Sequence, residues 1–224
     1  HTWQSDVNKS KTIIWGHSQG GHSSAFAAQL ASSYAPELQF QGAVVLAPGL
    51  LPSLPLAVQG LLASTQPSGQ TGFVMEIAGA WSAIYPNQMA PSDILTPAGV
   101  AKLPVVNQVC GNEVFDQFMS GPMSDFVKDP VPAVFYTLAT ENTPGSERIQ
   151  MPIIMAQGMK DTTIIPQLTL AFNKQLCEMG NTVDFHIYPN DTHPGVVVNS
   201  QGIVQSWIKD RFNGEPAPNN CSND

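Results

Sequence analysis

The sequence predicts an α/β protein with a parallel sheet, and three observations support that prediction. A β-branched run, Thr12–Trp15, leads directly into the Ala- and Leu-rich stretch Gln19–Tyr34, which is typical of a strand followed by a helix. Phe40–Leu46 is almost continuously apolar, as strands buried on both faces are. From Met151 onward, strand and helix patterns alternate again.

The composition narrows the range of partners. The chain has 224 residues, enough for one domain with an inserted subdomain. Its 9 basic and 17 acidic residues give a net charge of −8, so we exclude nucleic acid and anionic membrane surfaces as partners. No apolar run is long enough for a transmembrane helix. Only 12% of the residues are charged, a composition that is common in extracellular hydrolases. The chain opens without Met, so we expect a processed or cut polypeptide.

A sharp turn joins the first predicted strand to the first predicted helix. It consists of Gly16-His17-Ser18-Gln19-Gly20, with the serine at its centre. Such a turn exposes the Ser18 hydroxyl at its apex and directs the backbone N–H of Gln19 toward the same point, which is the nucleophile elbow of an α/β-hydrolase. The alternative is a serine in an ordinary glycine-rich turn. The two interpretations differ in whether an acid and a base follow downstream.

α/β-Hydrolases carry the acid after one late strand and the histidine after the next. Asp161 follows the predicted strand Ile153–Gln157, and His193 follows the predicted strand Val183–Tyr188. Because the carboxyl ends of parallel strands meet at the edge where ligands bind, we predict Asp161 as the acid and His193 as the base. The competing interpretation makes Asp161 a turn or cap residue and His193 an ordinary loop histidine. Other carboxylates and histidines fit a strand end less well: Asp184, Asp191, His1, His17, His22 and His186.

This set of residues predicts nucleophilic ester hydrolysis. Ser18 Oγ attacks the carbonyl carbon, His193 takes its proton, and Asp161 holds the other imidazole N–H. The Gln19 amide donates to the oxyanion that forms. No metal-ligand spacing and no cofactor motif is present in the sequence, so we predict neither a metal nor a cofactor.

The middle of the chain differs from its two ends. We expect residues 1–50 and 150–224 to form the α/β core and residues 51–149 to form a mostly helical lid insertion, because frequent prolines break that stretch into short segments. In one segment, four apolar side chains recur at helical spacing: Phe73, Ile77, Trp81 and Ile84. Such a face suits a cap over an acyl-binding pocket and equally a helix buried in a core.

The chain has three cysteines, Cys110, Cys177 and Cys221, so one of them has no partner within it. A bond between Cys177, on a predicted helix, and Cys221 would attach the Pro- and Asn-rich tail to the domain, which suits a secreted protein. The alternative is three reduced thiols in a cytosolic enzyme.

Several motifs together resemble the secretory lipase family of lipase A type: Gly16–Gly21, a long insertion, Gly158–Asp161, Thr192–Gly195 and the closing stretch from Trp207 to Cys221. The resemblance covers most of the chain and is loosest in the insertion. It implies an α/β-hydrolase with a helical lid, an extracellular location, and carboxylic ester or triacylglycerol substrates. It also implies a disulfide between Cys177 and Cys221, and a second disulfide from Cys110 to a cysteine upstream of the elbow.

The start of the chain departs from that family. A complete α/β-hydrolase has four strands before the elbow strand, so we expect this chain to hold only the C-terminal half of the fold, strands 5–8. The outer edge of Thr12–Trp15 would then pair with a preceding segment or with a partner chain, and Cys110 would bond to the same segment. The second oxyanion donor, which normally follows strand 3, would also be missing.

Two other functions fit the same residues. A serine peptidase or amidase would use the same elbow, acid and base, and only assays of matched esters and amides distinguish it from an esterase. A non-catalytic module that binds apolar ligands or a partner chain would keep the fold without an activated serine. Labelling of Ser18 by a fluorophosphonate probe separates that module from an enzyme.

Overall fold

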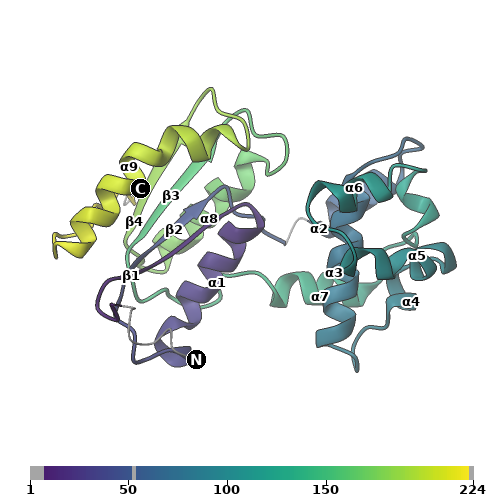
Figure 1. Cartoon of the computed structure of the whole chain (residues 1–224), viewed down its shortest axis with the longest axis horizontal. Coiled ribbons are helices and arrows are strands. Elements are labelled where there is room, and N and C mark those ends of the chain that lie inside the picture. Colours follow the sequence, from purple (N-terminus) through teal and green to yellow (C-terminus); the bar gives the residue numbers. More distant parts are fainter. Residues whose placement is uncertain (1–7, 52–53, 222–224) are drawn as a thin grey trace. The chain divides into compact units, whose positions relative to one another are not determined.

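A computed structural model describes residues 8–51 and 54–221 (Figure 1). The chain divides into two units. The first contains the residues up to Leu50 and from Thr143 on, and the second contains Leu51–Asn142. The first unit holds the sheet, and the second is an insertion between two strands of that sheet.

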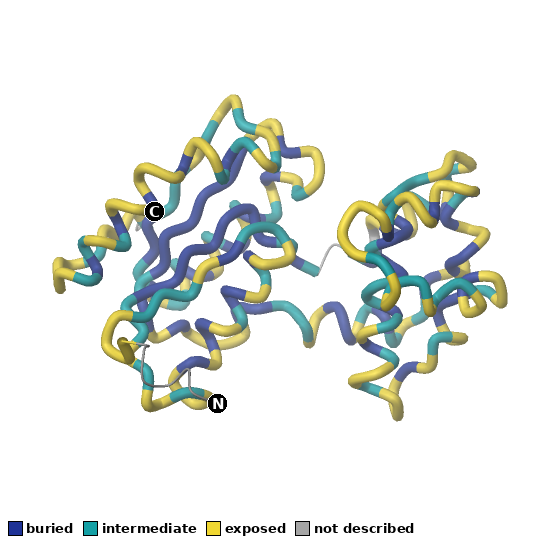
Figure 2. The backbone as a smooth tube through the Cα atoms, viewed as in Figure 1, coloured by how far each residue is buried: buried dark blue, intermediate teal, exposed yellow. Residues whose placement is uncertain are grey.

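The sheet of the first unit has four strands in the order β1-β2-β3-β4, and every neighbouring pair is parallel. The strands are β1 (Thr12–His17), β2 (Phe40–Leu46), β3 (Ile153–Gly158) and β4 (Val183–Tyr188). The central strands β2 and β3 are buried along most of their length (Figure 2). Their continuous apolar runs follow from this position, because helices cover both faces of a parallel sheet. The predicted α/β fold with parallel strands is confirmed.

Helices lie on both faces of the sheet (Figure 1). On one face α1 (Gln19–Tyr34) and α8 (Pro166–Glu178) pack on alternate strand residues such as Ile153 and Met155. On the other face α9 (Gly195–Phe212) packs on the residues between them, Ile154 and Ala156. Successive side chains of a strand point to opposite faces, so β3 contributes to two separate cores.

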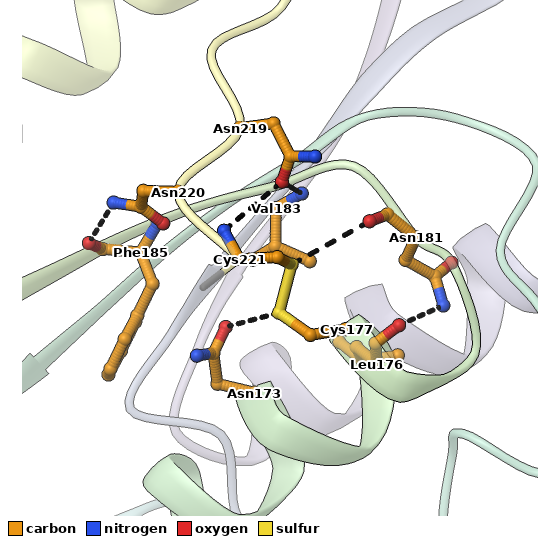
Figure 3. Close-up of a disulfide and its surroundings, with 9 residues drawn as sticks. All are labelled: Asn173, Leu176, Cys177, Asn181, Val183, Phe185, Asn219, Asn220 and Cys221. Atoms are coloured by element: carbon orange, nitrogen blue, oxygen red, sulfur yellow. Dashed lines mark hydrogen bonds between the residues drawn. A yellow bond between two sulfur atoms is a disulfide. The ribbon is translucent and has the colours of Figure 1, made fainter. Parts of the chain in front are cut away.

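The C-terminal tail is attached to the outer edge of β4 (Figure 3). Cys221 forms a disulfide with Cys177 of α8. The Asn220 side chain accepts a hydrogen bond from the Phe185 N–H and donates one to the Phe185 carbonyl, each at 2.8 Å. Asn219 Oδ1 accepts from the Val183 N–H at 3.2 Å, and the Asn220 N–H donates to the Val183 carbonyl at 2.9 Å. The side-chain amides of Asn219 and Asn220 and the backbone N–H of Asn220 therefore occupy backbone groups that a neighbouring strand would otherwise bind.

The second unit is helical, as far as its described residues go, and has its own apolar core. Large buried side chains of this core include Trp81, Met89, Phe118 and Phe135. Its elements are α2 (Leu54–Leu62), α3 (Gln70–Ile84), α4 (Pro91–Ile94), α5 (Pro97–Lys102), η2 (Leu103–Asn107), α6 (Asn112–Gln117), η3 (Met123–Asp125) and α7 (Ala133–Glu141).

The burial of α3 differs from the single apolar face that its spacing indicates. Of the four predicted positions, Trp81 is buried, whereas Ile84 is 68% exposed. Val74 and Met75 are buried instead. The helix contacts α4, α6 and η2, so its buried surface spreads around it and no single stripe faces one partner. Over the described ranges, none of the helices combines the length and apolarity that crossing a bilayer requires.

Candidate active site

The turn between β1 and α1 holds Ser18 in a strained conformation. Its φ of 59° and ψ of −123° lie in a region that residues with a Cβ rarely adopt. Ser18 is the N-cap of α1, a position where a serine normally accepts a bond from the helix backbone, yet its hydroxyl makes no capping bond. Backbone bonds fix the turn: the Ser18 N–H donates to the Leu46 carbonyl at 3.0 Å, and the Gly49 N–H donates to the Ser18 carbonyl at 2.9 Å. The strained turn leaves the Ser18 hydroxyl available for chemistry.

Two glycines of this turn are required by close backbone contacts. A Cβ on Gly16 would lie 1.9 Å from the Gly20 carbonyl oxygen, and a Cβ on Gly21 would lie 2.7 Å from that of Leu46. A Cβ on Gly20 would meet no atom within 4 Å. The Gly-x-Ser-x-Gly pattern therefore identifies one of the sterically required glycines, and the second is Gly21.

Asp161 uses its two carboxylate oxygens for different purposes. Oδ1 accepts from the Thr163 and Ile164 N–H groups, both at 2.8 Å, and so forms the turn that leads into α8. Oδ2 lies 2.7 Å from His193 Nδ1. The side chain of Asp161 is fully buried. The turn role and the proposed acid role are therefore compatible, since each uses a separate oxygen.

The loops that carry Asp161 and His193 are tied to each other by backbone contacts. The Met159 N–H donates to the Tyr188 carbonyl, and the Lys160 N–H donates to the Asp191 carbonyl, both at 2.9 Å. A Cβ on Gly158 would lie 2.5 Å from the same Asp191 oxygen, so this approach requires a glycine. The ends of adjacent strands β3 and β4 thus hold the carboxylate against the imidazole.

The hydrogen-bond partners determine the tautomer of His193. A carboxylate only accepts, so Nδ1 carries the proton that it donates to Asp161. In the neutral ring the lone pair is then on Nε2, the nitrogen that a general base uses in serine hydrolases. Among the described residues Nε2 has no hydrogen-bond partner.

His17, the residue before Ser18, contacts His193 directly. The two rings lie 4.4 Å apart between centroids, and His17 Nε2 is 3.0 Å from the His193 carbonyl oxygen. A carbonyl only accepts, so His17 Nε2 carries a proton and donates it. Burial, and then the neighbouring His193 ring, lower the pKa of His17 below its ordinary value. The sequence only ranks His17 below His193 as a candidate base, whereas the structure places it in contact with His193.

The structure brings some of the predicted residues together and leaves others apart. Asp161 and His193 are hydrogen-bonded, and Ser18 is the chain neighbour of a residue that contacts His193. Between Ser18 Oγ and His193 no hydrogen bond is formed within the described part of the chain. The Gln19 N–H begins α1 and donates to no protein acceptor among those residues, so it is free to bind an oxyanion.

Two buried polar residues next to Asp161 were not predicted. The Gln157 amide nitrogen lies 3.2 Å from Asp161 Oδ2, and the Thr169 hydroxyl donates to Gln157 Oε1 at 2.6 Å. Gln157 belongs to the face of β3 that packs on α8, where apolar residues are expected. The polar side chain of Gln157 at a core-facing strand position is the sequence feature that could have indicated this buried polar contact.

The remaining candidates have structural roles. His186 Nε2 lies 2.9 Å from Asp184 Oδ1, two residues away on β4, and neither residue follows the carboxyl end of the strand. Cys177 and Cys221 are bonded, and Cys110 is free and exposed. Among the described residues no group of three His, Cys, Asp or Glu side chains could hold a metal ion.

The parallel sheet, the strained serine turn and the helices on both faces define an α/β-hydrolase. A family model described as secretory lipase matches residues 3–220, so the chain belongs to the secretory lipase family. This family and two Malassezia globosa relatives named as secreted lipases confirm the predicted extracellular location. The predicted resemblance to this family is confirmed.

Relatives and solved structures agree with this assignment. A secreted triacylglycerol lipase of Malassezia globosa is 24% identical over 96% of this chain and 49% of its own length. A protein of Mycobacterium tuberculosis named "Probable inactive lipase" is 26% identical over 91% of this chain and 46% of its own length. Candida antarctica lipase A in its closed state matches with a TM-score of 0.78 at 19% identity, over 98% of this chain and 53% of that one. The chain thus spans about half the length of the curated relatives it matches.

Proposed function

We propose that this protein is a serine esterase or lipase that hydrolyses carboxylic esters of the acylglycerol type. The observation that carries the proposal is the 2.7 Å bond between Asp161 and His193, beside a strained Ser18 whose hydroxyl makes no capping bond. In this mechanism Ser18 Oγ attacks the ester carbonyl carbon while His193 Nε2 takes the hydroxyl proton. Asp161 stabilises the imidazolium, and the Gln19 N–H donates to the oxyanion.

The intermediate then breaks down in two stages. His193 returns the proton to the leaving alcohol, which leaves an acyl group on Ser18. A water molecule, deprotonated by His193, attacks this acyl-enzyme and releases the carboxylic acid, and Ser18 recovers its proton.

Replacement of Ser18 by alanine tests the proposal. Ser18→Ala should lower the hydrolysis of a short p-nitrophenyl ester by at least about 10³-fold, because no other residue supplies the nucleophile. Ser33→Ala is a matched control on the same helix, where the hydroxyl only bonds the Leu30 carbonyl. A fluorophosphonate probe should label the wild-type chain and Ser33→Ala but not Ser18→Ala. Full activity in Ser18→Ala, or no labelling of the wild type, would contradict the proposal.

We also propose that the Leu51–Asn142 unit is a cap that binds acyl chains. Its position in the chain, between β2 and β3, and its exposed apolar side chains Ile84 and Met119 support this role. Long-chain esters should then be hydrolysed faster than acetyl esters, and amides of the same acyl groups much more slowly. Equal rates for long and short chains would count against the cap.

The outer edge of β1 is a further part of the proposal. Among the described residues β1 pairs only with β2, and an apolar groove lined by Trp15, Val197 and Ile208 lies beside it. We propose that a preceding segment or a partner chain adds a strand here, and that Cys110 bonds a cysteine of that segment. Hydrogen exchange tests this: in the 224-residue chain alone, β1 amides that do not bond to β2 should exchange rapidly. Protection of these amides would show that the edge is already covered.

A further inference from the structure

A buried polar chain connects helix α8 to Asp161. Thr169 and Gln157 are both 0% exposed. The Thr169 hydroxyl donates to Gln157 Oε1 at 2.6 Å. On its other side, the Gln157 amide nitrogen lies 3.2 Å from Asp161 Oδ2, which is also the oxygen that accepts the His193 proton.

The orientation of the Gln157 amide is determined by its surroundings. Its nitrogen also faces the carbonyl oxygens of Gly158 at 3.0 Å and Ile164 at 3.2 Å, so all three neighbours of this nitrogen are acceptors. The Oε1 side faces the one donor, Thr169. Turning the amide over would point Oε1 at a buried carboxylate and two carbonyl oxygens, and would remove a donor from each of these acceptors.

We propose that Gln157, oriented by Thr169, is a positioning residue that aligns Asp161 Oδ2 with His193 Nδ1. This inference rests on the proposed function, since Asp161 and His193 are its acid and base. The Oδ1 oxygen is fixed by the Thr163 and Ile164 N–H groups, and the Gln157 amide supplies the corresponding restraint on Oδ2. The restraint comes from a neutral donor, so it orients the carboxylate without removing its charge.

Thr169 allows the inference to be tested without removing the amide. Thr169→Val keeps the shape of the side chain but lacks the hydroxyl, so the amide is free to turn over. The expected result is a fall in kcat of about 10- to 100-fold with little change in KM, because a misaligned base slows the reaction without altering substrate contacts. Thr169→Ser retains the hydroxyl and should restore most of kcat.

A matched control separates this effect from the loss of any buried hydroxyl. Thr71 of α3 is also 0% exposed, and its hydroxyl has no hydrogen-bond partner among the residues that the structure describes. Thr71→Val makes the same chemical change in the other unit and should leave kcat within about two-fold of the wild type. An equal fall in kcat for Thr71→Val and Thr169→Val would overturn the inference.

Gln157→Met provides a second variant and a pH readout. Without the amide, the negative charge of Asp161 is directed more fully at His193, which favours the protonated ring. The acid limb of kcat/KM should therefore move to higher pH, a change that a purely structural role would not produce. Among the described residues, the ionisable groups shown to interact with Asp161 are His193 and His17, and both are present in every variant. Thr169→Val should have little further effect in the Gln157→Met background, whereas additive effects would contradict the coupling.

A measurement that does not depend on turnover distinguishes the two proposals. The proton resonance of His193 Nδ1–H in NMR spectra reports its bond to Asp161. It should shift or broaden in Thr169→Val and Gln157→Met, and stay unchanged in Thr169→Ser and Thr71→Val. An unchanged resonance in all four variants would overturn the inference. Absence of Ser18-dependent hydrolysis in the wild type would instead refute the proposed function.

Discussion

The two halves of the candidate site are held in place by different kinds of interaction. On the elbow side, Ser18 is half-buried and strained, and steric contacts among Gly16, Gly20 and Gly21 shape its turn. On the acid–base side, Asp161 is fully buried and unstrained, and it accepts four hydrogen bonds from side chains and backbone. Ser18 is thus positioned by backbone geometry that leaves its hydroxyl free, whereas Asp161 is positioned by hydrogen bonds to both of its carboxylate oxygens.

The largest expected effect comes from breaking the acid–base half at Asp161. In Asp161→Asn, the carbonyl oxygen should remain with the Thr163 and Ile164 N–H groups, so the new NH₂ group faces His193 Nδ1. His193 then carries its proton on Nε2, where it cannot accept one from Ser18, and kcat should fall about 10⁴-fold.

A neighbouring carboxylate serves as the control for that variant. Within the described part of the chain, Asp191 Oδ1 accepts the Asn199 amide, a bond that an asparagine oxygen can also accept, and the buried Oδ2 has no hydrogen-bond partner to lose. Asp191→Asn should therefore retain kcat within a few-fold of the wild type in the same ester assay. Comparable losses in the two variants would indicate a general effect of carboxylate removal and not a role for Asp161 in orienting His193.

A smaller effect is expected from the glycines of the elbow half. Gly16→Ala places a Cβ against the Gly20 carbonyl and should destabilise the fold by about 1–3 kcal/mol or more. Gly20→Ala meets open space within a helix and should leave the free energy of unfolding unchanged or raise it by up to about 1 kcal/mol. Urea unfolding of the two variants measures the difference. Equal destabilisation would mean that the turn is not shaped by the contact described.

The smallest effect is expected at His17, where the two halves meet. Since the pKa of His17 is lowered in the folded protein, the unfolded chain binds more protons as pH falls below the ordinary histidine value near 6.5, and stability falls. His17→Phe keeps a ring against His193 but does not titrate. It should lose about 1 kcal/mol at pH 7 through the missing hydrogen bond, and should lose less stability than the wild type between pH 7 and pH 5. Urea unfolding at pH 7 and pH 5 measures the loss of stability. An equal loss in the wild type and in His17→Phe would contradict this prediction.

The same difference between the halves explains what could be predicted from the sequence. The elbow is local, so a strand, five residues and a helix were enough to locate Ser18. Asp161 and His193 were accessible because parallel strands bring their carboxyl ends together wherever they lie in the chain. Gln157 and Thr169 could not be identified in this way, because their hydrogen bond forms only when α8 lies beside β3. For a related reason, the four apolar positions of α3 did not define its buried surface: periodicity assumes one partner, and this helix has several.

The tail beside β4 limits how copies of this sheet could associate. Asn219 and Asn220 occupy the outward backbone groups of Val183 and Phe185, so among the described residues only Ile187 of that edge is left uncovered. One residue is too short to nucleate a strand pair, so a second copy of the sheet cannot pair with β4 while the tail is in place. Cleavage or reduction that releases the tail would uncover the outward backbone groups of Val183 and Phe185, and another strand could then add to β4.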